Sequence, residues 1–183
     1  GCPRSVSDGS AWVWSRVSLG RSFNYASHPA GSCLRAKVAM IFALFLLAAA
    51  SAQPVGETFT CTPTRVWDGD GPIWCAEGPR IRLAGIATRE MDGSCSRGHP
   101  CPSASAVQAR DALVRLIGQR VGVHSQGHIL VRGPALTCRS EGSAGGNRTA
   151  AWCVSPRSGD LSCAMVRGGW ALRWDRYWRN HRC

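Results

Sequence analysis

Carboxylates and arginines in a particular order are the residues of this chain that could act on a phosphodiester. Asp70 lies in an Asp-Gly-Asp-Gly turn between apolar segments, and Arg82 lies on the next predicted strand. Glu90 follows in the segment IATRE, and Arg148 comes much later. A hard cation takes oxygen ligands and neutralises phosphate charge. A glutamate can activate water, and arginine forks match the charge of five-coordinate phosphorus. These residue types together indicate phosphodiester hydrolysis.

The same residues also have ordinary structural interpretations. Asp-Gly-Asp triplets are most often simple turns, because Asp and Gly favour turn backbone. Arg82 could face solvent on an alternating strand, and Arg148 could be a solvated arginine after a glycine-rich turn. Glu90 could pair with Arg89 or Arg97 in its loop. The histidines show no partner pattern, and we expect them to be structural or solvated.

The elements that must position these residues are short strands and two helices. β-branched residues predict a strand over 57–66, and alternation predicts another over 80–86. An apolar stripe predicts a helix over 102–118, with Pro102 in its first turn and Gly118 at its end. Further elements are predicted as strands at 121–124, 129–132, 136–139 and 149–154, and a short helix within 161–169. This pattern indicates an α+β domain with a small, strongly curved sheet or barrel.

Three segments divide the chain. Two cations, an apolar run over 38–50 and Ala-Ser-Ala predict a signal peptide at 34–52, cleaved after Ala52. The run is shorter than the roughly 20 residues of a membrane span, although a retained N-terminal anchor is the alternative. Residues 1–33 are expected to be an upstream extension foreign to the native protein, or disordered. The domain is then 53–183, secreted or periplasmic, with no stable membrane association after cleavage.

The predicted mature part is strongly basic. Residues 53–183 contain 17 Arg and no Lys against 10 Asp plus Glu, which gives a formal net charge of +7. A compact domain with this charge favours a polyanionic partner, with nucleic acid first and anionic envelope or heparin-like polymers next. The alternative is that the arginines serve solubility and reflect a GC-rich genome.

Eight cysteines follow the predicted signal, and an even number in that context indicates disulfides. No Cys-x-x-Cys or zinc-finger spacing occurs, which disfavours a zinc site. Sequence alone allows 105 pairings of eight cysteines. Local geometry favours two links between strands, one loop closure and one tether for the tail: Cys61–Cys75, Cys138–Cys153, Cys95–Cys101 and Cys163–Cys183.

Five segments resemble the staphylococcal nuclease (thermonuclease) family in their order and spacing. They are VWDGDG, RIRLAGIATRE, PSASAVQARDALVRLIG, GNRTAAW and LSCAMVRGGWALRW, and the resemblance spans about residues 57–178. The resemblance implies an OB-fold-like five-stranded β-barrel with two or three helices packed on it. It also implies Ca²⁺-dependent cleavage of DNA and RNA with little sequence preference.

The resemblance also implies a role for each matching position. Asp70 matches the carboxylate that binds calcium, and Thr88 the residue whose backbone carbonyl binds the same ion. Glu90 matches the proposed general base. Arg82 and Arg148 match the two catalytic arginines.

Departures from the family concentrate at the metal. Ala87 stands where the family has a second calcium-binding aspartate, which should weaken the site because affinity follows ligand charge. Asp92 or a water is the candidate replacement. Asp68 is expected to form the turn rather than bind the ion, Arg89 replaces a proline, and Gly71 replaces a threonine.

Two main functions follow from these residues. The first is a monomeric, secreted or periplasmic metal-dependent nuclease. The second, favoured by Ala87, is a disulfide-stabilised OB-fold module that binds nucleic acid or another polyanion with little or no cleavage. A structural protein of the cell envelope, with incidental basic charge, is the third.

Overall fold

The computed structural model describes residues 51–183, which form a mixed α+β domain. The predicted extension over 1–33 and the predicted signal up to residue 50 lie outside the described residues. None of the helices in the described part has the length and apolar character needed to cross a membrane.

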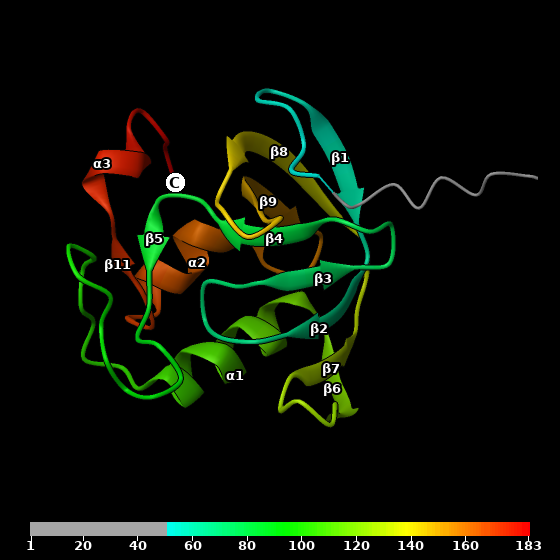
Figure 1. The fold of residues 1–183 in the computed structure, drawn as a ribbon, viewed down its shortest axis with the longest axis horizontal. Helices are drawn as coiled ribbons and strands as arrows, with labels where there is room; N and C mark the ends of the chain where they lie inside the picture. The colour runs from blue at the N-terminus through cyan, green and yellow to red at the C-terminus, as the bar shows by residue number, and fades with distance from the viewer. Residues whose placement is uncertain (1–50) are drawn as a thin grey trace, which may run out of the picture. The chain divides into compact units, whose positions relative to one another are not determined.

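Nine strands form the main sheet. They are β1 (Thr58–Cys61), β2 (Pro63–Val66), β3 (Ile73–Cys75), β4 (Arg80–Leu83), β6 (Gln119–Val123), β7 (Ile129–Arg132), β8 (Leu136–Ser143), β9 (Thr149–Ser155) and β10 (Gly159–Asp160). The order is β1-β8-β9-β4-β3-β2-β7-β6, with β10 paired to β9 (Figure 1). All pairs are antiparallel except β4 with β9.

The predicted single strand over 57–66 is two strands, which is a correction to the sequence-based expectation. The break falls at Thr62, whose N–H donates to Glu77 Oε2 at 2.8 Å and whose hydroxyl donates to Glu77 Oε1 at 2.7 Å. One residue separates β1 from β2, yet these strands stand first and sixth in the sheet order. The sheet must therefore curl strongly so that both ends of this short segment stay in it.

A second, two-stranded sheet pairs β5 (Ile86–Ala87) with β11 (Leu172–Arg173). The helices are α1 (Ala106–Ile117), α2 (Leu161–Arg167) and α3 (Asp175–Trp178). In the view of Figure 1, β5, β11 and α3 lie at one end of the domain, and the β6–β7 hairpin at the other.

Helix α1 begins at Ala106 rather than in the predicted first turn at Pro102. Ser105 is the N-cap: its side chain accepts from the Gln108 N–H at 3.2 Å, and the Gln108 side chain accepts from the Ser105 N–H at 2.9 Å. This reciprocal capping box satisfies donors that the first turn would otherwise leave unpaired. The helix end at Gly118 is confirmed.

The core lies between the curled sheet and helices α1 and α2. Leu113 and Ile117 of α1 and Leu161 of α2 are fully buried, together with Ile81 and Leu83 of β4. Because β4 has its apolar residues in the core, the alternating Arg82 is turned to the opposite face of that strand.

Four disulfides fasten the domain, and all four predicted pairings are confirmed. One joins β1 to β3, one joins register partners of β8 and β9, one closes a loop, and one ties α2 to the C-terminal segment: Cys61–Cys75, Cys138–Cys153, Cys95–Cys101 and Cys163–Cys183. This number of disulfides is typical of proteins from an oxidising, extracellular-type environment.

Candidate functional site

The Asp-Gly-Asp-Gly turn is held by a hydrogen bond within the turn and another to β4, and it packs closely against α1. The Asp70 N–H donates to Asp68 Oδ1 at 3.2 Å, which confirms Asp68 as the residue that forms the turn. The Leu83 N–H donates to the Asp70 carbonyl at 2.8 Å and ties the turn to β4. A Cβ at Gly69 would lie 2.4 Å from the Ala109 Cβ, so a glycine lets the turn approach α1 closely.

Position 71 is glycine, where the thermonuclease family that the sequence resembles has threonine. The local backbone explains this difference. Gly71 has φ +116°, a backbone conformation that side chains disfavour. A Cβ there would also lie 2.4 Å from the Ile81 carbonyl oxygen. The close passage of the turn over β4 therefore requires glycine.

The Asp70 carboxylate is buried and holds two donors on one oxygen. Arg82 Nη2 donates to Asp70 Oδ2 at 2.7 Å, and the Thr88 N–H donates to the same oxygen at 3.2 Å. Asp70 is 3% exposed and the Arg82 side chain 17%. Arg82 is therefore not a solvent-facing arginine. The structure brings Asp70, Arg82 and the Thr88 N–H together, whereas the resemblance assigns the role at Thr88 to its backbone carbonyl.

Two carboxyl groups share the positive charge of one arginine in this turn. Burial, and after it the Asp70 charge, raise the pKa of Asp68 to about 8 against the lowering effect of Arg82. Burial also raises the pKa of Asp70, against the lowering effect of Arg82 and of the Thr88 N–H. Asp68 is therefore mainly protonated at neutral pH, and Arg82 is the partner of the Asp70 carboxylate.

Position 87 offers no second carboxylate. Ala87 is fully buried in β5 and pairs with Leu172 of β11. Asp92 is exposed and accepts a hydrogen bond from the Ser94 N–H at 2.8 Å, so it is held in its own loop. The side-chain oxygens shown at this turn are thus the carboxyl groups of Asp70 and Asp68, while Thr88 presents its N–H to Asp70.

Glu90 is held in the loop that follows β5. Its Oε1 accepts from the Ser96 hydroxyl at 2.6 Å, and its N–H donates to the Ser94 carbonyl at 2.9 Å. Arg89 donates instead to the carbonyls of Pro102 and Gly93, both at 2.9 Å, which excludes it as the partner of Glu90. The charge of Glu90 contributes to the raised pKa of Asp70.

Arg82 and Arg148 line one cavity of about 420 Å³. Arg148 is held at its edge by hydrogen bonds to the carbonyls of Gly145 at 3.1 Å and Ala144 at 3.2 Å. The cavity lies between β4, the end of β8 and the C-terminal segment. Two arginines from distant parts of the sequence therefore face one space, while Asp70, Thr88 and Glu90 are not among its lining residues.

Aromatic side chains form a second wall of this cavity. His99 and Trp174 have ring centroids 4.1 Å apart, and Trp174 meets Tyr177 edge-on at 4.5 Å. Arg179 and Glu141 also line it and approach each other at 3.9 Å. The sequence-based prediction missed His99 and Arg179 as cavity residues. The interleaving of aromatics with arginines in the C-terminal segment was the signal that could have found Arg179.

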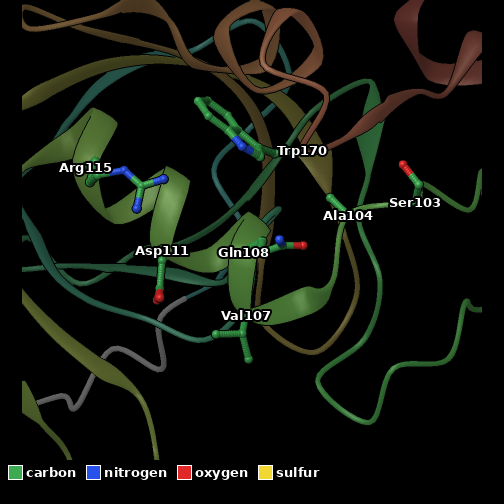
Figure 2. Close-up of a pocket in the computed structure, with 7 residues that line it drawn as sticks. All are labelled: Ser103, Ala104, Val107, Gln108, Asp111, Arg115 and Trp170. Atoms are coloured by element: carbon green, nitrogen blue, oxygen red, sulfur yellow. The ribbon is translucent and has the colours of Figure 1, made fainter.

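A second, larger hollow lies on the surface of α1 (Figure 2). It measures about 530 Å³ and contains none of the predicted site residues. Its lining is Ser103, Ala104, Val107, Gln108, Asp111, Arg115 and Trp170. The cavity lined by Arg82 and Arg148, called the arginine cavity below, is therefore the candidate site. Of the two hollows, it is the one that combines several arginines with aromatic side chains.

Comparison of the chain with protein-family models and with curated proteins found no match. What this chain does is therefore inferred from its residues and their geometry.

Proposed function

We propose that this chain is a secreted or periplasmic, monomeric, metal-dependent nuclease that hydrolyses the phosphodiester bonds of DNA and RNA with low sequence specificity. The observation that carries the proposal is the convergence of Arg82 and Arg148 on one cavity, with Arg82 anchored to the Asp70 turn. The order and identity of these residues match the thermonuclease pattern.

The strand pairing supports an OB-fold-like five-stranded barrel as the scaffold. If β1 and β2 are taken as one bent strand, that strand pairs with β3 through β2 and with β8 through β1. The remaining pairs are β3 with β4, β4 with β9, and β9 with β8. Five strands would then close on one another, with the β6–β7 hairpin as an addition at β2.

The arginines would bind the phosphate and favour its charged transition state. A guanidinium stays protonated at any working pH and can bind two phosphate oxygens at once. Arg82 is pre-oriented by Asp70, and Arg148 by two carbonyls, so little freedom is lost when a phosphate enters. Arg179 adds a third positive charge to the lining.

Glu90 would act as the general base that accepts a proton from the attacking water. The Ser96 hydroxyl fixes one of its oxygens, and among residues 51–183 no hydrogen bond engages the other. A carboxylate held in this way keeps one oxygen available for water.

Ca²⁺ would be held weakly by Asp70 and the Thr88 carbonyl. Carboxylate and carbonyl oxygens are the ligands that a hard cation takes, and a bound cation would favour the charged form of Asp70, whose pKa burial raises. When bound, the ion would neutralise phosphate charge and polarise a water. Ala87 leaves the site with fewer charged ligands than a tight calcium site has, so we expect low affinity.

Low sequence specificity follows from the kind of contacts available. Arginines that bind phosphates contact the nucleic-acid backbone, which carries no direct sequence information. Aromatic faces such as Trp174 and Tyr177 can stack on any base.

The second candidate function is binding of nucleic acid without cleavage. Two features near the Asp-Gly-Asp-Gly turn favour it. Position 87 is a buried alanine, and Arg82 already compensates the charge of the Asp70 carboxylate. The net positive charge of the domain would support either function.

The deciding experiment incubates the oxidised domain with single-stranded DNA in Ca²⁺ or in EDTA. We expect cleavage that EDTA abolishes. Glu90→Ala and Arg148→Ala should each lower the rate by about 100-fold to 1,000-fold, as removal of one transition-state contact does. Arg139→Ala, which removes the same charge from an exposed position outside the cavity, is the matched control. Binding without EDTA-sensitive cleavage would reject the enzyme in favour of the binding module.

Ala87→Asp tests the metal assignment. A carboxylate at this position should lower the Ca²⁺ concentration needed for half-maximal cleavage by about tenfold or more, because affinity rises with ligand charge. Ala87→Asn is the control of similar size without the charge. An unchanged calcium requirement in the aspartate variant would mean that the cation binds elsewhere.

A further inference from the structure

A second group of potential metal ligands lies beside the C-terminal tether, away from the Asp70 turn in the sequence. His181 Nε2 lies 3.0 Å from Asp160 Oδ2 and 3.7 Å from Cys163 Sγ. These ligand atoms of three residues all lie within 4.8 Å of one another. A sulfur, an imidazole nitrogen and a carboxylate oxygen are the donors that Zn²⁺ takes in proteins.

In the oxidised protein the sulfur of this group is engaged in the disulfide with Cys183. A disulfide sulfur is not a zinc ligand, because the metal requires the thiolate. Reduction of this disulfide would convert Cys163 and Cys183 into thiols, with the Cys163 thiol beside His181. The potential ligands would then be Asp160, His181 and the Cys163 thiolate, whose sulfur lies 3.7 Å from His181 Nε2.

Contacts other than the disulfide fix two of the ligands. Asp160 caps α2, and its Oδ1 accepts from the Cys163 N–H at 2.8 Å while Oδ2 faces His181. The His181 ring stacks on Trp152, with centroids 3.6 Å apart and planes 8° from parallel. The His181 carbonyl also accepts from Trp178 Nε1 at 2.8 Å. The group is therefore arranged before any metal binds.

We propose that Asp160, Cys163 and His181 form a three-residue Zn²⁺ site when the Cys163–Cys183 disulfide is reduced. Exchange with a dithiol reductant transfers two electrons: the dithiol becomes a disulfide, and Cys163 and Cys183 become thiols. Binding of Zn²⁺ then releases the thiol proton of Cys163, and the metal joins α2 to the C-terminal segment through Cys163 and His181. The C-terminal segment is thus held by a disulfide in one redox state and by a metal in the other.

This metal link has a consequence for the arginine cavity. The segment that it holds also carries Trp174, Tyr177 and Arg179, which line that cavity. After reduction of the disulfide, the metal link would keep these three side chains in position along the cavity. The zinc site itself does not depend on the proposed nuclease activity.

Single-cysteine variants test the site without a reductant and leave the other three disulfides intact. Cys183→Ser frees the Cys163 thiol beside His181 and Asp160, whereas Cys163→Ser frees only Cys183. Each variant has one free thiol, so the two are matched. Both would be titrated anaerobically with Co²⁺ and with Zn²⁺, and the oxidised wild type in parallel.

We expect Cys183→Ser to bind one Co²⁺ per chain, with a thiolate-to-cobalt charge-transfer absorption. It should bind Zn²⁺ at least about tenfold more tightly than Cys163→Ser does, and His181→Gln in the Cys183→Ser background should remove this advantage. The oxidised wild type should show no such absorption. Equal metal binding by the two single-cysteine variants would overturn the proposal. If Cys183→Ser folds only with Zn²⁺ present, the proposal is supported, and failure to fold even with Zn²⁺ overturns it.

Discussion

Among the aspartates that pair with a basic side chain in residues 51–183, Asp70 and Asp160 differ in burial. Asp70 and Arg82 meet at 2.7 Å with the Asp70 side chain 4% exposed, whereas Asp160 and His181 meet at 3.0 Å with both side chains about one-fifth exposed. A second buried carboxyl, Asp68, accompanies the first pair, and a disulfide accompanies the second. Loss of the arginine would leave a buried charge without a partner. Loss of the histidine would leave the Asp160 carboxylate, which water can reach.

The largest expected effect is that of Arg82→Ala on stability. Removing one partner of a buried ion pair costs about 3–5 kcal/mol, because the other charge remains buried and uncompensated. His181→Gln should cost about 1 kcal/mol, the usual contribution of one hydrogen bond, because water can reach both partners. Urea unfolding of both variants at one pH measures the difference. Equal losses would mean that burial does not separate the two pairs.

Removal of the C-terminal disulfide has the next largest expected effect. Cys163 and Cys183 are 20 residues apart, and the double alanine variant should lose about 3 kcal/mol through the greater entropy of the unfolded chain. Cys95 and Cys101 are 6 apart, so their double alanine variant should lose about 1 kcal/mol less. Thermal unfolding of both, compared with the wild type, measures this. The reverse order would show that native contacts of the loop at 95–101 outweigh loop entropy.

The smallest expected effect, counted per pH unit, is the pH dependence that Asp68 contributes. Its raised pKa means that its contribution to stability is fully present below about pH 4 and is lost as the pH rises through about 8. Over that range one titrating proton changes the free energy of unfolding by about 1.4 kcal/mol per pH unit. Asp68→Asn, which can still accept from the Asp70 N–H, should flatten the profile between pH 5 and 8. Parallel profiles for variant and wild type would contradict a buried carboxyl at this position.

Much of the local structure follows from the sequence. The four disulfide pairings, the turn at Asp68 and the helix end at Gly118 were all predictable, because each depends on residues close together in the chain. The start of α1 was predicted four residues too early. There the capping box of Ser105 with Gln108 decides the boundary, and Pro102 does not.

The candidate site was predictable only in part. The order of Asp70, Arg82, Glu90 and Arg148 indicated a shared function, but not that Arg82 would bind Asp70 directly or that Glu90 would hold Ser96. Pairing partners among charged side chains depend on which rotamers the packed chain allows, and sequence spacing does not determine this.

The sequence by itself determined the residue types, the basic charge, the turn and the covalent links of this protein. Only the tertiary structure decided that Arg148 and Arg82 line one cavity, and that His181 contacts both Asp160 and Cys163. The physical reason is the same in both places. These contacts join segments far apart in the chain, so they exist only after the sheet has curled and the C-terminal segment has closed against α2.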